Sequence, residues 1–319
     1  MTDVVYIMGH GLSGSTLLAL LLGSHPDIAT VGETAIAPRS PNKRMAFTCS
    51  CHAAYHDCAF WQDVTRAMAE RGYDFDIEDS GLVFRAPDRP LVDALLRFRG
   101  RGAAFEALRD VGLMLAPGAR RTLAALKARN RDFIEVVTRL RGARVFLDGS
   151  KRPERALYLR RTPGLSVKVI HLVRDGRAVA CSAMKNWSMP AEEAARLWTR
   201  TNRHCLRARP HFAPDSWLML RYEDLCAEPA GVMQMLHRFI GVEPQPAPTD
   251  FRAGQHIIGN RMRLASTTEI RLDERWKTAL SPADLATIER HVTPLNRRFG
   301  YLADDMARAF RPQIAREQA

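Results

Sequence analysis

The sequence VVYIMGHGLSGST occupies residues 4–16 and contains the parts of a phosphate-binding loop. Val4–Met8 is a continuously apolar run, as expected of a strand that is buried on both faces. Gly9–Gly14 interrupts this run, and Ser15–Gly23 (STLLALLLG) then has the length and composition of a helix. Glycines let backbone N–H groups turn toward an anion, and a helix start adds its positive dipole end. The stretch therefore predicts an anion site after the first strand.

The loop fits the spacing G-x-x-x-x-G-K-[ST] of nucleoside-triphosphate loops except at one position. Thr16 is present, but Ser15 stands where a lysine would reach the β- and γ-phosphates. The loop therefore favours a shorter, diphosphate-like group over ATP. A small-molecule P-loop kinase is a less favoured alternative, and an ordinary glycine turn between strand and helix is another.

Strands and helices alternate along much of the chain. This alternation predicts the α/β class, with a mainly parallel sheet flanked by helices. The further strand-type runs are Ile28–Val31, Arg144–Leu147, Val167–Val173 and Trp217–Arg221, and helix-like segments follow at Arg152–Arg161, Arg177–Asn186 and Pro229–Ile240.

Polar and glycine residues follow the predicted strands. Because ligands of parallel sheets bind at the carboxyl ends of strands, we expect these residues to converge on one crevice. They are Gly9–Gly14, Gly32-Glu33, Asp148–Lys151, Arg174-Asp175 and Tyr222-Glu223.

The composition is that of a globular chain, with 319 residues of which 46% are hydrophobic. One domain over residues 1–319 is expected, and residues 311–319 are a candidate disordered tail. Residues 35–60 form a predicted polar loop. Residues at about 61–142 form a largely helical insertion, interrupted near Pro87, Pro90 and Pro117.

The net charge of +12 favours a polyanionic partner. A nucleic acid, an anionic membrane or a phosphorylated nucleotide would fit, but no nucleic-acid motif accompanies the charge, so no nucleic-acid partner is expected. No run of about 18 apolar residues occurs, and no charged leader precedes Val4. These features predict no transmembrane segment and a cytoplasmic location.

Three of the six cysteines are clustered in the sequence. Cys49, Cys51 and Cys58 lie near His52 and His56, and such a group can bind zinc. However, the spacing lacks the paired Cys-x-x-Cys motifs of common structural zinc sites. Buried thiols without a metal are therefore the favoured interpretation.

A second anion site is predicted after the run Val167–Val173. Arg174 follows this run directly, and Ser182 lies on the expected next helix. An arginine and a serine so placed can hold a phosphate through charge-assisted hydrogen bonds. Asp175 is expected to cap the helix that starts near Arg177. A surface ion pair of Arg174 is the alternative.

Together the two loops resemble those of sulfotransferases that use 3′-phosphoadenosine-5′-phosphosulfate (PAPS). The family's R-S-G-[ST]-T loop corresponds to Leu12–Thr16, and its R-D-x-R…S element to Arg174–Arg177 and Ser182. The likeness looks closest to the branch shared by tyrosylprotein sulfotransferases and bacterial small-molecule sulfotransferases. It extends through His25-Pro26, Gly32-Glu33, Asp148–Lys151, Arg221–Leu225, Gly259-Asn260, Arg263 and Asn296…Phe299-Gly300-Tyr301.

This resemblance implies a P-loop-like sulfotransferase fold, PAPS as the donor, no metal, and a hydroxyl of a small-molecule acceptor as the target. In-line displacement would release 3′,5′-diphosphoadenosine, and a homodimer is a candidate assembly. Glu33 would be the base, and Lys151 would contact the bridging oxygen and the leaving phosphate. The expected nucleotide-binding residues are Gly11, Leu12, Ser13, Gly14, Ser15, Thr16, Arg174, Ser182, Tyr222, Asn260 and Arg263.

Leu12 departs from the resembled pattern, because it replaces the arginine of the loop. His10 or Lys151 could supply the missing charge, and Lys151 is favoured because it is charged at neutral pH. The departure also leaves open a nucleotide-binding relative with impaired catalysis. His10 and His256 are alternative bases.

The acceptor pocket is expected to come from segments 35–60, 74–142 and 186–215. Their aromatic residues, such as Trp61, Trp187 and Trp198, could line this pocket or belong to the core.

Overall fold

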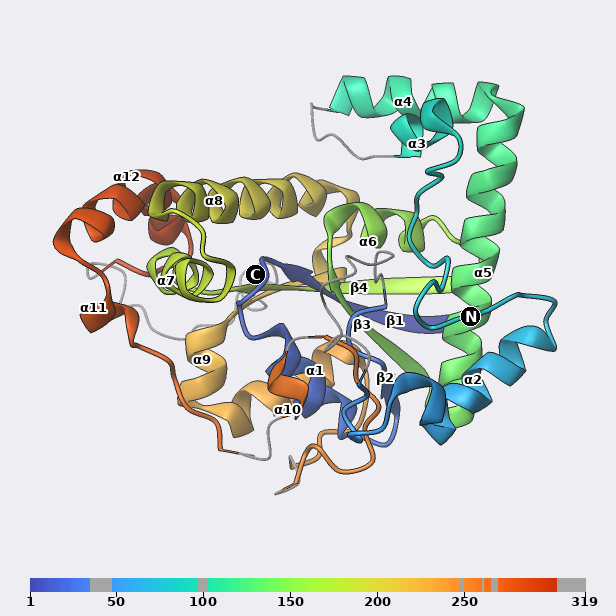
Figure 1. Cartoon of the computed structure of the whole chain (residues 1–319), viewed down its shortest axis with the longest axis horizontal. Coiled ribbons are helices and arrows are strands. Elements are labelled where there is room, and N and C mark those ends of the chain that lie inside the picture. Colours follow the sequence, from blue (N-terminus) through green and yellow to red (C-terminus); the bar gives the residue numbers. More distant parts are fainter. Residues whose placement is uncertain (35–47, 97–102, 247–249, 260, 265–268, 303–319) are drawn as a thin grey trace, which may run out of the picture.

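A computed structural model describes residues 1–34, 48–96, 103–246, 250–259, 261–264 and 269–302. Within these residues, five parallel strands form one sheet in the order β2-β3-β1-β4-β5, with helices on both faces (Figure 1). The predicted α/β class with a parallel sheet is confirmed. The strands are β1 (Thr2–Gly9), β2 (Ile28–Thr30), β3 (Val145–Lys151), β4 (Leu165–Val173) and β5 (Trp217–Arg221).

The central strand β1 is apolar on both faces because helices cover both. Val4, Tyr6 and Met8 face a core that also contains side chains of α2 (Ala59–Ala69), α5 (Pro117–Arg141) and α6 (Pro153–Arg160). Val5 and Ile7 point to the other face, which α1 (Ser15–Gly23), α9 (Tyr222–Ala227) and α10 (Pro229–Ile240) cover. This two-sided burial explains why the sequence of β1 is continuously hydrophobic.

A third group of helices packs beside the carboxyl end of β4. Trp198 is fully buried where α7 (Gly176–Trp187), α8 (Ala191–Ala208) and α12 (Pro282–Arg298) meet. Asp175 caps α7 as predicted, because its carboxylate accepts a hydrogen bond of 2.9 Å from the Arg177 amide. The remaining helices are α3 (Pro90–Leu96), α4 (Ala103–Leu115), α11 (Trp276–Ala279) and the short 3-10 turns Tyr55–Asp57, Arg209–His211, Pro214–Ser216 and Arg261–Leu264.

Strand β3 is longer than the sequence pattern predicts. The apolar run ends at Leu147, yet β3 continues to Lys151, which pairs with Met8 after a register shift in β1. Asp148 is tolerated in this buried strand because its carboxylate lies 2.7 Å from the guanidinium of Arg155, which is also buried. The predicted strand-end motif at Asp148–Lys151 therefore belongs to the strand itself.

The predicted helical region near 61–142 contains α2, α3, α4 and α5, but residues 70–89 are not helical. Arg129 of α5 holds this irregular stretch by donating to the Ser80 and Asp74 carbonyl oxygens at 2.8 and 2.6 Å. The single-domain organisation with this region as an insertion stays a prediction. The candidate tail at 311–319 lies outside the described residues.

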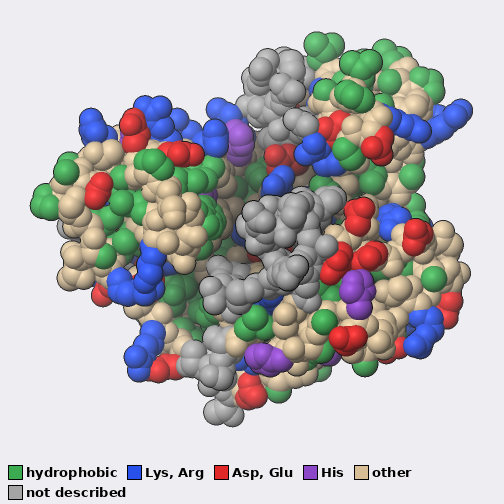
Figure 2. Space-filling view, in the orientation of Figure 1, with side chains coloured by type: hydrophobic (Ala, Val, Ile, Leu, Met, Phe, Trp, Pro, Cys, Tyr) green, Lys and Arg blue, Asp and Glu red, His purple; other side chains and the backbone are tan. Residues whose placement is uncertain are grey.

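The face of the described residues shown in Figure 2 is mixed in charge and includes an apolar region. Basic and acidic side chains are interspersed on the face in Figure 2, and hydrophobic side chains gather over α4. Leu108, Met114 and Leu115 of that helix are 68–77% exposed. Across the described ranges, no helix is both long and apolar enough to span a bilayer. The homodimer stays a prediction.

Candidate active site

The loop after β1 leads into the start of α1 and has the geometry of the predicted anion site. Gly14 has a left-handed backbone with φ 88°, and a Cβ atom there would lie 2.3 Å from the Tyr222 ring, so only glycine fits. Gly14 offers no capping side chain, and the first helical hydrogen bond runs from the Leu18 amide to Gly14. The earlier amides of α1 are thus left for an external acceptor. The buried Ser13 hydroxyl also has no partner within the described structure.

Arg174 brings the end of β4 to this loop. Its guanidinium donates to the Leu12 carbonyl oxygen at 3.0 Å and lies 4.6 Å above the Tyr222 ring. The same side chain donates to the Asp273 carbonyl oxygen at 3.0 Å and lies 3.4 Å from the Asp273 carboxylate. Its Nε is buried without a partner in the described part of the chain. The two predicted anion loops therefore meet, with a buried guanidinium between them.

Glu33 and Lys151 form an ion pair at the ends of β2 and β3. The Lys151 ammonium nitrogen lies 2.7 Å from a Glu33 carboxylate oxygen. The Glu33 amide donates to the Ile258 carbonyl oxygen at 3.0 Å, and Gly149 donates to Gly32 at 2.7 Å. Lys151 has a left-handed backbone with φ 70°, which is uncommon for a residue other than glycine. Strained backbone of this kind is concentrated at functional sites.

His10 follows β1 directly and is buried. Its Nδ1 lies 2.5 Å from the Gly11 carbonyl oxygen, which can only accept, so Nδ1 carries the proton and Nε2 is an acceptor. Burial lowers the pKa of His10 below its ordinary value, and the nearby charge of Lys151 lowers that pKa too. His10 is therefore a neutral imidazole at pH 7.

The other predicted nucleotide-binding residues are less closely connected to this centre. Ser182 lies on α7, and its carbonyl oxygen accepts from Asn186. Arg263 is buried and donates to the carbonyl oxygens of Thr48 and Gly259. Asn260 lies outside the described residues. Gly11, Ser15 and Thr16 lie in or directly after the loop.

Most of the aromatic side chains proposed for an acceptor pocket belong to the core. Trp61 and Trp198 are 1% and 0% exposed. Trp187, at the end of α7, is 45% exposed and its ring centre lies 5.9 Å from that of His10. A Cβ atom at Gly11 would lie 3.1 Å from Trp187. Trp187 is therefore the aromatic residue of this group that is both accessible and beside the loop.

Two motifs noted in the sequence, Arg221–Leu225 and Asn296…Tyr301, supply hydrogen bonds at the carboxyl end of β4. The Glu223 carboxylate accepts from the Asp175 amide at 3.1 Å and from the Tyr301 hydroxyl at 2.7 Å. Burial raises the pKa of Glu223. Asn296 donates to Asp175 at 2.9 Å and accepts from the Gly176 amide at 3.0 Å. These contacts stabilise the turn that follows Arg174. The sequence could not predict them, because the residues involved lie far apart in the chain.

Known proteins share sequence features with this chain. Residues 116–246 match the sequence profile described as the Sulfotransferase family. This match covers less than half of the chain and shows similarity to that family. This confirms the resemblance inferred from the two loops and the motifs between them.

Two relatives are carbohydrate sulfotransferases. Carbohydrate sulfotransferase 3 of Tetronarce californica is 28% identical over 163 residues, which cover 43% of this chain and only 36% of that protein. Carbohydrate sulfotransferase 7 of Mus musculus is 24% identical, over 93% of this chain and 74% of that protein.

Solved sulfotransferase structures also show similarity. The sulfotransferase domain of the Synechococcus PCC 7002 olefin synthase aligns with a TM-score of 0.49 and 19% identity, covering 91% of this chain and 94% of that one. The sulfotransferase domain of the curacin biosynthetic pathway aligns with a TM-score of 0.49 and 17% identity, covering 93% and 98%.

These relatives correct one prediction. The cytoplasmic location predicted from the sequence is contradicted by the similarity to these carbohydrate sulfotransferases. The prediction relied on the lack of a long apolar run and of a charged leader, and such absences do not establish a compartment.

Proposed function

We propose that this chain transfers a sulfuryl group from PAPS to a hydroxyl of a small-molecule acceptor. The observation that carries this proposal is that four groups meet at the edge of one sheet. The amide-lined loop after β1 and Arg174 supply anion-binding groups, and Glu33 and Lys151 supply a carboxylate and an ammonium. Such an arrangement can bind an anionic donor and accept a proton beside it.

The residues present fit a nucleotide that carries phosphates at both its 5′ and 3′ positions. The uncapped start of α1 and the unpartnered Ser13 hydroxyl would hold the 5′ end. The unpartnered Nε of Arg174 would donate to the 3′-phosphate, with Ser182 as the further predicted contact. Tyr222 lies between Gly14 and Arg174, where its ring would pack against the nucleotide. Ser15 in place of lysine disfavours a nucleoside triphosphate.

When bound, PAPS supplies the sulfuryl group and departs as 3′,5′-diphosphoadenosine. Glu33 would accept the proton of the acceptor hydroxyl as the bond from the acceptor oxygen to sulfur forms. Lys151 would donate to the bridging oxygen as the bond between sulfur and the 5′-phosphate oxygen breaks. The transition state is loose and in line, so positioning and charge stabilisation carry most of the catalysis.

His10 is the third group proposed for the reacting centre. Its Nε2 can accept a hydrogen bond from the acceptor hydroxyl, while Nδ1 stays bonded to Gly11. Because the pKa of His10 is lowered by burial, a positive charge on this ring requires acidic pH or a bound anion. Lys151 is therefore the group that replaces the charge of the loop arginine, which is Leu12 in this chain.

The most specific part of the proposal concerns the chemical class of the acceptor. The named relatives are carbohydrate sulfotransferases, so carbohydrate hydroxyls are the acceptors to test first. The exposed ring of Trp187 beside His10 provides a flat apolar surface against which a sugar or aromatic acceptor can pack.

Ligand-dependent thermal stability and a transfer assay test the function together. A ligand that binds the native state raises the melting temperature with concentration. We expect 3′,5′-diphosphoadenosine to stabilise the chain more than ATP with magnesium, and labelled PAPS to label a carbohydrate or phenolic acceptor. Preference for ATP with magnesium would instead support a kinase. Stabilisation by 3′,5′-diphosphoadenosine without transfer to any acceptor would identify a nucleotide-binding relative with impaired catalysis.

A further inference from the structure

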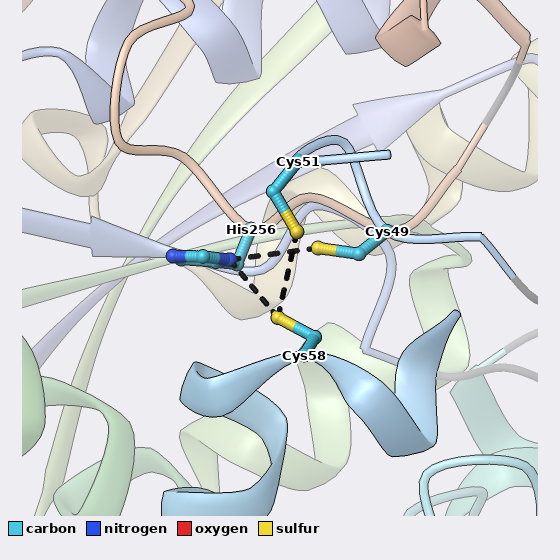
Figure 3. A group of neighbouring side chains, drawn as sticks. All are labelled: Cys49, Cys51, Cys58 and His256. Carbon is cyan, nitrogen blue, oxygen red and sulfur yellow. Dashed lines mark hydrogen bonds between the residues drawn. The ribbon is translucent and has the colours of Figure 1, made fainter. Parts of the chain in front are cut away.

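Three cysteines and one histidine from two distant segments lie close together (Figure 3). Cys49, Cys51 and Cys58 lie in the segment that precedes α2, and His256 lies in the segment that follows α10. The Sγ atoms of Cys49 and Cys58 lie 3.5 and 3.3 Å from the His256 Nδ1, and the Sγ atoms of Cys51 and Cys58 are 3.6 Å apart. All four potential ligand atoms lie within 4.8 Å of one another.

We propose that Cys49, Cys51, Cys58 and His256 bind one structural zinc ion in tetrahedral geometry. With Zn–S about 2.3 Å and Zn–N about 2.0 Å, tetrahedral angles place two sulfur atoms about 3.8 Å apart, and a sulfur and a nitrogen about 3.5 Å apart. The observed separations of 3.3–3.6 Å agree with these values to within a few tenths of an ångström. Four side chains are therefore already spaced for one ion.

The surroundings fix the histidine in this orientation. The Phe60 ring stacks on the His256 ring, with centres 4.7 Å apart and planes 9° apart. The Ser50 hydroxyl donates to the Gln255 carbonyl oxygen at 2.6 Å and accepts from the Ile257 amide at 2.7 Å. Both neighbours of His256 are thus held by a residue of the cysteine segment. Ligands supported in this way bind metal more tightly than mobile ones do.

The donor set selects zinc over other occupants. Three thiolates and one imidazole are soft and intermediate donors, which suit Zn²⁺ and disfavour magnesium or calcium. An iron–sulfur cluster would spread its ligands over more than one iron, whereas here every pair of ligand atoms is close enough to share one ion. A disulfide between Cys51 and Cys58 would require their sulfur atoms to approach from 3.6 Å to about 2.0 Å.

The sequence analysis favoured buried thiols because the fourth ligand is far away in the chain. His52 and His56, the histidines near the cysteines, are exposed, and His56 lies 3.6 Å from the Glu78 carboxylate instead. The ligand is His256, and only the fold brings it to the cysteines.

The ion would support the candidate base from a distance. Two residues after His256, Ile258 accepts from the Glu33 amide at 3.0 Å and donates to the Val31 carbonyl oxygen at 2.7 Å. Four protein ligands leave no open coordination position, so this zinc would act as a structural crosslink and not as a catalyst. It would join the segment before α2 to the segment that holds the backbone of Glu33.

Metal analysis of the full chain tests the proposal without reference to activity. We expect about one zinc per chain by inductively coupled plasma and native mass spectrometry, after expression in zinc-containing medium. X-ray absorption at the zinc edge should show three sulfur neighbours at about 2.3 Å and one nitrogen neighbour at about 2.0 Å. This measurement on the unmodified chain remains decisive even if ligand variants fail to fold.

Matched variants identify the ligands. Cys51→Ser and His256→Gln should each lower the zinc content at least about tenfold after dialysis against a weak chelator, because loss of one ligand weakens the site. His52→Asn and Cys181→Ser remove an imidazole and a thiol outside the site and should retain about one zinc. Asparagine suits position 52, where φ is 69°.

Three results would overturn the zinc proposal. They are a zinc-free chain after supplemented expression, an iron–sulfur chromophore, and a Cys51–Cys58 disulfide found by mass spectrometry in freshly purified protein. Because each is read from metal or thiol content, each is independent of whether the chain transfers sulfuryl groups.

Discussion

The ammonium of Lys151 is paired with the carboxylate of Glu33, at a distance of 2.7 Å. The candidate base and the candidate leaving-group cation therefore neutralise each other in this structure. An anionic donor that binds the loop after β1 must compete with Glu33 for Lys151. Under the proposed function, this exchange frees the carboxylate for the acceptor proton only when the donor is present.

Glu33→Gln should lower the turnover number by about a hundredfold or more, because the amide cannot accept the acceptor proton. Affinity for 3′,5′-diphosphoadenosine should be retained or increased, since Lys151 loses its competing carboxylate. Steady-state kinetics with labelled PAPS and calorimetry with the product nucleotide measure the two effects. Near-normal turnover would assign the base to another residue, with His10 the nearest alternative. His256, the other alternative, lies in the cysteine cluster.

Lys151→Ala should nearly abolish transfer, with a loss of about a hundredfold or more, because a charged donor to the bridging oxygen is removed. His10→Ala should cause a smaller loss at pH 7.5, where the ring is neutral because burial lowers its pKa. The relative loss from His10→Ala should grow as pH falls, since the imidazolium form then becomes populated. Turnover of both variants at pH 5.5–8 tests this order, and an inactive His10→Ala beside an active Lys151→Ala would reverse it.

Arg174→Ala should weaken binding of 3′,5′-diphosphoadenosine by about 10- to 100-fold, which corresponds to about 1.5–3 kcal/mol for a charge-assisted phosphate contact. The KM for PAPS should rise more than the KM for the acceptor. Arg271→Ala is the matched control, because this arginine is in the same segment as Asp273 but its side chain is 78% exposed. Equal effects of the two substitutions would indicate general charge attraction and remove the specific assignment of Arg174.

Leu12→Arg should leave nucleotide affinity unchanged or improve it. The substituted position has φ 65°, and its carbonyl oxygen already accepts from Arg174, so the loop geometry does not depend on the leucine side chain. The arginine stem can cover the apolar surface that Leu12 now contacts. Calorimetric titration of the variant measures the effect, and a marked loss of affinity would mean that the site is built around an apolar residue.

The stability of the chain should fall as pH decreases from about 6.5 to 4, partly because of His171. Burial lowers the pKa of this fully buried ring to about 4, although its hydrogen bond to Asn202 opposes the shift. Below pH 6.5 the unfolded chain takes up a proton that the native chain does not, so unfolding is favoured by up to about 1.4 kcal/mol per pH unit. The stability that neutral His171 contributes is fully present above about pH 6.5, the pKa of a histidine in the unfolded chain.

Urea unfolding between pH 7.5 and 5 measures this effect. His171→Gln should be less stable at pH 7.5 but lose less stability on acidification, because the titrating group is gone. His52→Asn, which removes an exposed imidazole, should follow the parent curve. If the free energy of unfolding of His171→Gln falls with pH as steeply as that of the parent chain, other groups cause the pH dependence. One such group is His237, whose pKa is lowered to about 4.

Local sequence was sufficient for the elements that position the donor site. The helix Ser15–Gly23, the strand Trp217–Arg221 and the helix Pro229–Ile240 begin and end where the sequence predicts. In these segments the hydrophobic pattern and the flanking glycine or proline agree, so no distant contact is needed to define them. The meeting of Arg174 with the first loop also followed from the rule that strand ends share one edge of a sheet.

Contacts between distant residues could not be predicted. The pairing of Asp148 with Arg155 extends β3 past its apolar run, and no local pattern indicates that a buried aspartate has such a partner. In the same way, His256 carries no motif that connects it to Cys49, Cys51 and Cys58. The pairing of Glu33 with Lys151 depends on the order of β2 and β3 in the sheet, which the sequence alone does not fix.

Asp273 has a consequence for how fast a product nucleotide could leave. Its carbonyl oxygen accepts a hydrogen bond from the Arg174 guanidinium, and its carboxylate is paired with the same group. The hydrogen bond from Arg275, together with the charge of Arg174, holds the pKa of Asp273 well below its usual value. A 3′-phosphate would therefore displace a permanent anion, and that anion would return as the phosphate departs. Because the Asp273 carboxylate would replace the departing phosphate, the residence time of 3′,5′-diphosphoadenosine would be shortened. Asp273 would thus favour rapid turnover over tight product binding.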